Sequence, residues 1–93
     1  MKELTKLFKA LANERRLGIL HLLARERKGT VSDISRNLGL SIRSISKHLL
    51  KLEDAGLVMR KQTSRWVYYS LNNNPREEVK YLLKILHRRR RKF

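Results

Sequence analysis

Cysteine is absent from this 93-residue chain, and proline, glycine, aromatic residues and acidic residues are scarce. Without cysteine the chain can form no disulfide, bind no metal through thiolates and carry no thiol nucleophile or thiol redox sensor. Charged residues make up 33% of the chain, which is too many for a membrane span. The first eleven residues alternate charged and apolar side chains, unlike a secretory signal, so we expect a cytoplasmic protein.

The scarcity of acidic residues leaves the chain strongly basic. Lysine and arginine number 23 against eight aspartate and glutamate residues, a formal net charge of +15. Without the five basic residues 88–92, the remaining 18 basic residues still give a net charge of +10, so the charge belongs to the whole chain. Such a field attracts polyanions, first the phosphate backbone of a nucleic acid and second an anionic membrane surface. Charge alone does not choose between these partners.

The length fits a single domain, which we assign to residues 1–93. Hydrophobic residues make up 41% of the chain, enough for a core. A chain this short buries only about two thirds of its unfolded surface, which favours self-association.

Apolar stripes with helical spacing mark both ends of the chain. Helices are predicted over residues 1–12 and 75–87, each with apolar side chains at i, i+3, i+4 and i+7. The stripes are formed by Leu4, Leu7, Phe8 and Leu11 in the first helix and by Val79, Leu82, Leu83 and Leu86 in the last. A small core has limited room for both stripes, so we expect them to pair across a homodimer interface.

A central helix is predicted after residue 12, because its apolar side chains cover too many faces for a surface helix. Asn13 is a suitable N-cap, and Gly29 is predicted to end the helix in a left-handed conformation. Gly18 lies inside this helix, where glycine is unfavourable, which suggests close packing there. Asn74 and Pro75 predict the start of the last helix, as a cap followed by a first-turn proline.

Residues 30–55 have the pattern of a helix-turn-helix. Thr30 and Asp33 resemble a capping box for a short helix, which Gly39 ends with a positive φ. Ser41 then caps a second helix with inward-facing Ile45, Leu49 and Leu52. Two helices that meet across a tight glycine turn are typical of this motif.

Residues 57–71 predict a β-hairpin wing, because the apolar period changes from helical to alternating. The segment 60–65 is polar, basic and free of acids, which indicates a hairpin tip, with Gln62, Thr63 and Ser64 as a small flexible end. The aromatic residues Trp66, Tyr68 and Tyr69 could form the base-stacking platform of a single-strand binder. Strand alternation instead puts about half of them in the core, and we favour that interpretation.

The ordered motifs of this chain resemble the ArsR-type family of bacterial and archaeal transcriptional regulators. They span residues 7–71, about two thirds of the chain, and comprise Leu7–Leu17, Ile19–Leu20, Leu38–Ser41, Ile45–Leu49, Leu52–Val58 and Arg65–Leu71. The resemblance implies an α+β, mainly α, winged helix-turn-helix fold and a homodimer joined by its first and last helices. It further implies that two recognition helices enter successive major grooves of double-stranded DNA while the wings reach the flanking backbone or minor groove.

The outward face of the second helix of the helix-turn-helix is expected to contact DNA. The candidates are Ser41, Ile42, Arg43, Ser44, Ser46, Lys47, His48 and Lys51, joined by Lys61, Gln62, Thr63 and Arg65 from the wing. Arg43 can bond guanine O6 and N7, worth about 1 to 3 kcal/mol of discrimination, whereas Lys47 and Lys51 suit phosphates. Ile42 stands where similar proteins often carry a polar residue, so it either touches a thymine methyl group or reads nothing. His48 recurs in similar proteins and either packs or bonds a phosphate.

We expect no metal site, no cofactor and no enzymatic activity. Many relatives bind a metal through a Cys-Val-Cys string on the third helix, but Thr30–Ser32 stands here, and hydroxyls are poor ligands for soft metals. The sequence has no glycine-rich phosphate loop, nucleophile elbow or convergent pair of acids. Whether a small-molecule effector exists stays open.

These features predict a homodimeric, sequence-specific regulator that binds double-stranded DNA and represses transcription by occluding a promoter, with no membrane partner. One alternative is an architectural, chromatin-like protein of low sequence preference, which the charge of +15 favours. Another is a protein-interaction module that docks an acidic surface. RNA binding is a weaker alternative, because the A-form major groove excludes a recognition helix. The basic tail, residues 88–93, either adds phosphate attraction or takes no part.

Overall fold

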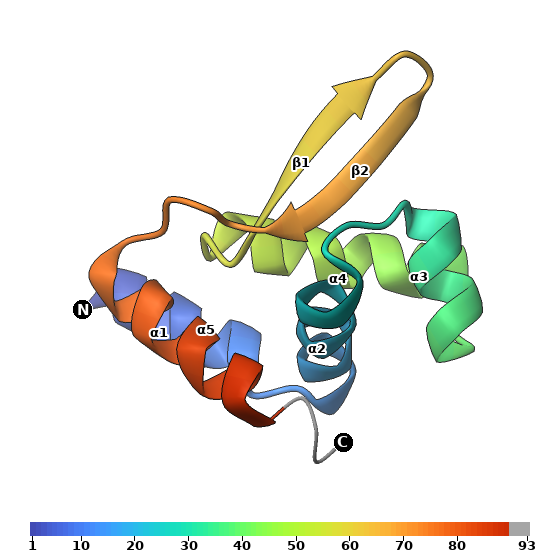
Figure 1. Ribbon diagram of the computed structural model, residues 1–93. Helices are drawn as coiled ribbons and strands as arrows, with labels where there is room; N and C mark the ends of the chain where they lie inside the picture. Colours follow the sequence, from blue (N-terminus) through green and yellow to red (C-terminus); the bar gives the residue numbers. More distant parts are fainter. Residues whose placement is uncertain (90–93) are drawn as a thin grey trace.

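A computed structural model describes residues 1–89 of the chain. Its elements, in order, are α1 Lys2–Leu11, α2 Glu14–Glu26, α3 Val31–Leu38, α4 Ile42–Asp54, β1 Val58–Thr63, β2 Trp66–Leu71 and α5 Glu77–Arg89 (Figure 1). The predicted mainly helical α+β winged helix-turn-helix is thereby confirmed. Residues 90–93, most of the predicted basic tail, lie outside the described residues.

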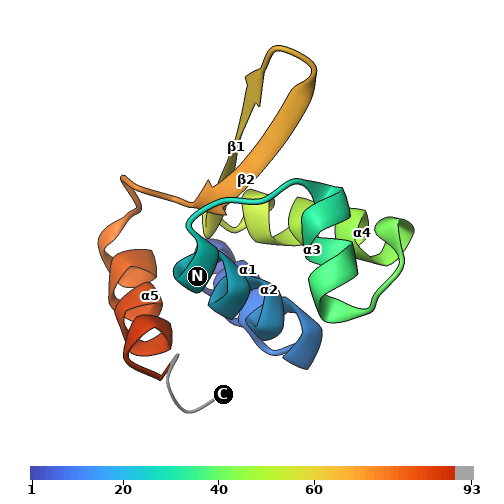
Figure 2. The same cartoon turned by 45° about the vertical axis from the view of Figure 1, so that its right-hand side comes forward.

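The core forms around α2, which packs against every other helix and against β2. Ile19, Leu20 and Leu23 of α2 are buried and meet apolar side chains from α3, α4 and the start of β1. In both views α5 lies at one end of the helical body and α3 at the other, while the β1–β2 hairpin projects away from the helices (Figures 1 and 2). The helix-turn-helix and the hairpin are therefore free to face one partner together.

The predicted N-caps of α2 and α3 are confirmed, whereas Asn74 does not cap the last helix, which begins at Glu77. The Asn13 side chain accepts a hydrogen bond from the Arg16 amide at 3.0 Å. At α3, the Thr30 hydroxyl accepts from the Asp33 amide at 3.0 Å, and the Asp33 carboxylate accepts from the Thr30 amide at 3.1 Å. This second bond is the main cause that lowers the pKa of Asp33 below its ordinary 3.8. The Thr30 hydroxyl is thus occupied as a hydrogen-bond acceptor for the backbone of α3.

The predicted left-handed stop at Gly29 is wrong. Helix α2 ends at Glu26, and Arg27 takes the positive φ of 75°. Gly29 instead forms an isolated β-bridge with Tyr69, with N–O distances of 2.8 and 3.0 Å. A Cβ atom at this position would make an ordinary van der Waals contact with Ile34 Cγ1 at 3.4 Å, so the backbone pairing with Tyr69 is what defines this position.

The last helix begins at Glu77, two residues later than predicted. Asn72 explains the difference because it anchors the preceding segment to the α4–β1 connection. Its amide donates to the Leu57 carbonyl at 3.0 Å, and its side chain donates to the Gly56 carbonyl at 2.9 Å. The Asn72 side chain also accepts from the Asn74 amide, which forms a turn before the helix.

Gly18 is not closely packed, contrary to the prediction. A Cβ atom at this position in the interior of α2 would meet no atom within 4 Å. We therefore expect Gly18→Ala to stabilise the protein by about 1 kcal/mol, the difference in helix propensity, and to raise Tm by about 4 to 8 °C. Thermal melts followed by circular dichroism would measure this.

Gly39→Ala is the matched control for that substitution. Gly39 has a φ of 66°, which alanine adopts at a cost, so this variant should be less stable than the native protein. If both alanine variants lowered Tm, the open space beside Gly18 would not be available to a side chain in solution.

Within residues 1–89 no helix is both long enough and apolar enough to cross a lipid bilayer.

Candidate nucleic-acid interface

The turn between α3 and α4 is fixed by local hydrogen bonds. Gly39 adopts the left-handed conformation that ends α3, and its amide donates to the Ser35 carbonyl. The Ser35 hydroxyl donates to the Leu40 carbonyl, and the Leu40 amide donates back to the Ser35 carbonyl at 3.2 Å. The Ser41 side chain then accepts from the Ser44 amide at 3.1 Å and caps α4. These bonds set the direction in which α4 leaves the turn.

Helix α4 is oriented by three inward side chains, Ile45, Leu49 and Leu52, none of which is exposed. Its opposite face carries the exposed side chains of Arg43, Lys47 and Lys51 in a row spaced by four residues. The other sequence-predicted residues border this row. Ser41 and Ile42 are exposed, whereas Ser44, Ser46 and His48 are half-buried at its edges.

Leu50 also lies on the outward face of α4 and was missed by the sequence analysis. Its side chain is 61% exposed, and it lies three residues after Lys47 and four after Ser46. With Ile42, which is 55% exposed, it adds apolar surface beside the basic row. Exposed apolar side chains on such a face suit the methyl group of thymine. The available signal was the helical position of Leu50, roughly 160° around the helix from the buried Leu52, but its apolar residue type obscures that signal.

His48 links α4 to α2. Its Nδ1 lies 3.4 Å from Nη1 of Arg16, and because a guanidinium can only donate, Nδ1 is the acceptor and Nε2 carries the hydrogen. Burial, together with the positive charges of Arg16, Arg15 and Lys51, lowers the pKa of His48 below its ordinary 6.5. The imidazole is therefore neutral at pH 7. The structure places it in a supporting position at the edge of the face.

The lowered pKa of His48 predicts a pH dependence of stability. The unfolded chain binds a proton at His48 more readily than the folded chain does, so the stabilisation is present above pH 6.5 and is lost as the pH falls through the folded-state pKa. Urea denaturation between pH 5 and 8 should show this loss. His48→Gln should reduce the loss, and equal slopes for the two proteins would contradict the assignment.

The wing is a regular hairpin almost to its end. Antiparallel pairing extends from Val58↔Leu71 to Thr63↔Trp66, which leaves only residues 64 and 65 as the turn. The prediction of a flexible tip over residues 62–64 is therefore wrong for residues 62 and 63, because cross-strand bonds hold them. Ser64 has a φ of 55°, a conformation that glycine adopts more easily. The predicted contacts are all exposed on this hairpin: Lys61, Gln62, Thr63 and Arg65.

The three aromatic residues of β2 divide between the two faces of the hairpin. Tyr69 is buried in the core, as we expected for about half of them. Trp66 is 52% exposed near the turn, and Tyr68, on the same face, lies beneath the Lys28 ammonium at 4.7 Å from its ring centre. The core interpretation is correct for Tyr69, whereas Trp66 and Tyr68 lie on the opposite face of the hairpin.

The first and last helices meet at the end of the molecule opposite α3. Arg76 Nη1, just before α5, lies 3.2 Å from Glu3 Oε2 of α1. Of the eight predicted interface residues, Leu7 and Val79 are completely buried within the protomer, so their side chains belong to its core and not to an interface. Leu4 and Phe8 are exposed, and the remaining four are half-buried, namely Leu11, Leu82, Leu83 and Leu86. Tyr81 and Ile85, which widen the predicted stripe of the last helix, add exposed apolar surface on α5.

Residues 13–60, which contain the whole helix-turn-helix and the start of the wing, match the family described as bacterial regulatory protein, arsR family. The arsenic resistance transcriptional regulator ArsR1 of Pseudomonas putida is 38% identical over 83% of this chain and 60% of its own length. The transcriptional activator HlyU of Vibrio cholerae is 40% identical over 88% of this chain and 72% of its own length. The chain thus spans less than two thirds of the first of these relatives.

A solved structure of similar shape supports the same comparison. It is the homodimeric winged helix-turn-helix DNA-binding domain of Mb0332 from Mycobacterium bovis, a possible ArsR-family transcriptional regulator. It superposes with a TM-score of 0.78 at 32% identity, and the match covers 91% of this chain and 75% of that one. A match over 91% of this chain extends well beyond the helix-turn-helix.

Proposed function

Because this chain belongs to the ArsR family of bacterial regulatory proteins, we propose that it acts as a homodimer that binds a specific double-stranded DNA sequence and represses transcription by occluding a promoter. The observation that carries the proposal is the row of Arg43, Lys47 and Lys51 on the outward face of α4. A helix of this kind fits the major groove, where Arg43 can read guanine and the lysines can bind phosphates. With DNA as its partner, we propose that the protein acts in the cytoplasm.

The wing supplies a second contact in this proposal. Lys61 and Arg65 are exposed on the projecting hairpin, which is free of acidic residues from Val58 to Leu71. Since the strands are paired almost to the turn, these charges are held at a fixed distance from α4. We assign them to the DNA backbone or minor groove beside the half-site.

The exposed apolar surface of α1 and α5 supports dimer formation. Phe8 is 56% exposed, Tyr81 72% and Ile85 46%, and these side chains lie at the same end of the molecule as half-buried leucines. A two-fold interface here would cover this surface and place two α4 helices on successive major grooves, about 34 to 36 Å apart.

We infer repression by occlusion because a dimer bound across a promoter would cover DNA that a polymerase needs. One relative is named an activator and another a repressor of an arsenical resistance operon, so the direction of regulation requires its own measurement. We propose no thiolate metal sensor, because the sequence has no cysteine.

Selection of bound duplexes from a random pool tests the proposal. A palindromic consensus with half-sites about one helical turn apart would support both base reading and the dimer. Enrichment of no sequence, with equal affinity for all duplexes, would instead indicate an architectural DNA-binding protein. Sedimentation at the same protein concentrations would report the oligomeric state directly.

A further inference from the structure

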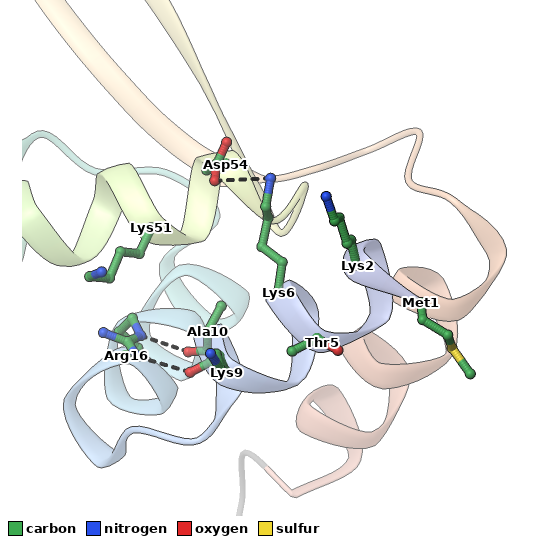
Figure 3. A pocket seen from close by; sticks show the side chains of 9 residues that line it. All are labelled: Met1, Lys2, Thr5, Lys6, Lys9, Ala10, Arg16, Lys51 and Asp54. Carbon is green, nitrogen blue, oxygen red and sulfur yellow. Dashed lines mark hydrogen bonds and ion pairs between the residues drawn. The ribbon is translucent and has the colours of Figure 1, made fainter.

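A pocket of about 490 Å³ lies between α1 and α4 (Figure 3). It lies beside the recognition face, by which we mean the outward row of Arg43, Lys47 and Lys51 on α4. Five cationic side chains line it, Lys2, Lys6 and Lys9 from α1, Arg16 from α2 and Lys51 from α4, together with the single carboxylate of Asp54. We propose that this pocket binds the DNA phosphates that lie between the two half-sites, so that α1 contacts DNA as well as the partner subunit. The inference rests on the proposed function and extends it to a helix that the sequence analysis assigned only to the dimer.

Helix α1 has two chemically distinct faces. Lys2, Lys6 and Lys9 follow one another at spacings of four and three, so they form one row along the helix. The apolar stripe, which includes Leu4 and Phe8, lies on the opposite side. From Lys2 to Lys9 the row spans about 10 Å along the helix axis. That length exceeds one phosphate group and fits consecutive phosphates, which rise about 3.4 Å each along a DNA strand.

The pocket has an uncompensated positive charge. Lys6 Nζ lies 3.3 Å from Asp54 Oδ2, but both side chains are largely exposed, and exposed ion pairs contribute little. The Arg16 guanidinium at the base of the pocket donates to the neutral carbonyls of Lys9 and Ala10, so its charge persists. A polyanion can therefore gain from several cations here at the cost of one weak ion pair.

Continuity with the recognition face favours DNA over a small anion as the occupant. Lys51 lines the pocket and also ends the outward row that begins at Arg43, so a strand held by α4 passes the pocket entrance. The α1 lysines are exposed, as phosphate contacts on a surface are, and Asp54 would repel a compact anion held within the pocket. Because the apolar face of α1 lies at the proposed two-fold axis, the lysine row on the far side of α1 lies within about one helix diameter, roughly 10 to 12 Å, of that axis. The phosphates near the axis are those between the half-sites.

The double variant Lys2→Gln/Lys9→Gln tests the inference and leaves the Lys6–Asp54 ion pair intact. Its affinity for the duplex selected by the native protein would be measured between 50 and 200 mM salt. Each lost phosphate contact lowers the slope of log K against log salt by about 0.9, so loss of at least two contacts per dimer should lower it by about 2 or more. The control Lys80→Gln/Lys84→Gln removes the same charge from exposed positions on α5, outside the pocket, and should leave the slope close to that of the native protein.

Neutral methylphosphonates between the half-sites locate the contact. They should weaken binding of the native protein at least tenfold and have little effect on the Lys2→Gln/Lys9→Gln variant. Equal slopes for the Lys2→Gln/Lys9→Gln variant and the control variant would overturn the inference and leave the proposed function in place. So would equal sensitivity of the native protein and the Lys2→Gln/Lys9→Gln variant to the methylphosphonates.

A small anion is the alternative occupant of the pocket. Saturable binding of pyrophosphate to the α1 lysines at submillimolar concentration, followed by NMR, would overturn the inference in favour of a small-anion site. If no duplex is selected at all, the proposed function fails and this inference fails with it.

Discussion

Replacement of both Arg43 and Lys47 by glutamate should weaken binding to the selected duplex at least about 10³-fold. Both side chains are exposed on the outward face of α4, and each contact is worth about 1 to 3 kcal/mol. A homodimer carries the change twice, and each glutamate adds repulsion from phosphate, so a loss of about 4 kcal/mol is a lower bound. Electrophoretic mobility shift or fluorescence anisotropy titrations at one fixed salt concentration would measure the loss.

Two controls separate loss of recognition from loss of charge or of fold. Lys80→Glu/Lys84→Glu makes the same charge change at exposed positions on α5 and should reduce affinity far less. Thermal melts should place the Arg43→Glu/Lys47→Glu variant within a few degrees of the native protein, because neither side chain is in the core. Unchanged DNA binding by this variant would remove α4 from the interface and favour the protein-interaction alternative.

Arg16→Leu should lower the free energy of unfolding by about 3 kcal/mol. Arg16 is only 9% exposed, and its guanidinium donates to the Ala10 carbonyl at 2.6 Å and to the Lys9 carbonyl at 3.0 Å. These are among the last carbonyls of α1, which have no partner within the helix. Leucine cannot replace either bond, and each unsatisfied acceptor costs about 1 to 3 kcal/mol. Urea denaturation would measure the difference.

The adjacent Arg15 provides a matched control, because it is exposed on the same helix. Arg15→Leu should change stability by no more than about 0.5 kcal/mol. Arg16→Lys keeps the charge but not the planar fork of donors, and should fall between the two. If Arg16→Leu and Arg15→Leu were equally stable, the guanidinium bonds would contribute nothing to the fold.

Local signals in the sequence predicted those features that depend on near neighbours. Asn13, Thr30 and Ser41 cap their helices as expected, because a capping side chain needs only the amide two or three residues ahead. The glycine turn at residue 39 and the inward positions of α4 were likewise predictable, since helical spacing alone sorts those side chains. The outward basic row of α4 follows from the same helical spacing.

Features that depend on distant parts of the chain were not predicted correctly. Gly29 was interpreted as a helix stop, but its conformation is set by pairing with Tyr69, forty residues away. Leu7 and Val79 have the same spacing as their exposed neighbours, and only the packing around α2 decides that they are buried. Leu50 was passed over because an apolar residue type favours the core even where its helical position faces outward. Arg16 gave no sequence signal of its role, since its partners are backbone carbonyls.

The position of Arg16 also affects which spacing between DNA half-sites the dimer would accept. One side chain joins the end of α1 to the body of α2 and reaches His48 on α4. In a dimer formed through α1, the separation of the two α4 helices then depends on rigid elements and not on a flexible connection. Adding one base pair between half-sites turns the second by roughly 35°, since a helical turn holds about 10 to 10.5 base pairs. A rigid pair of helices rejects such a site, and a protein with Arg16→Leu should tolerate it better.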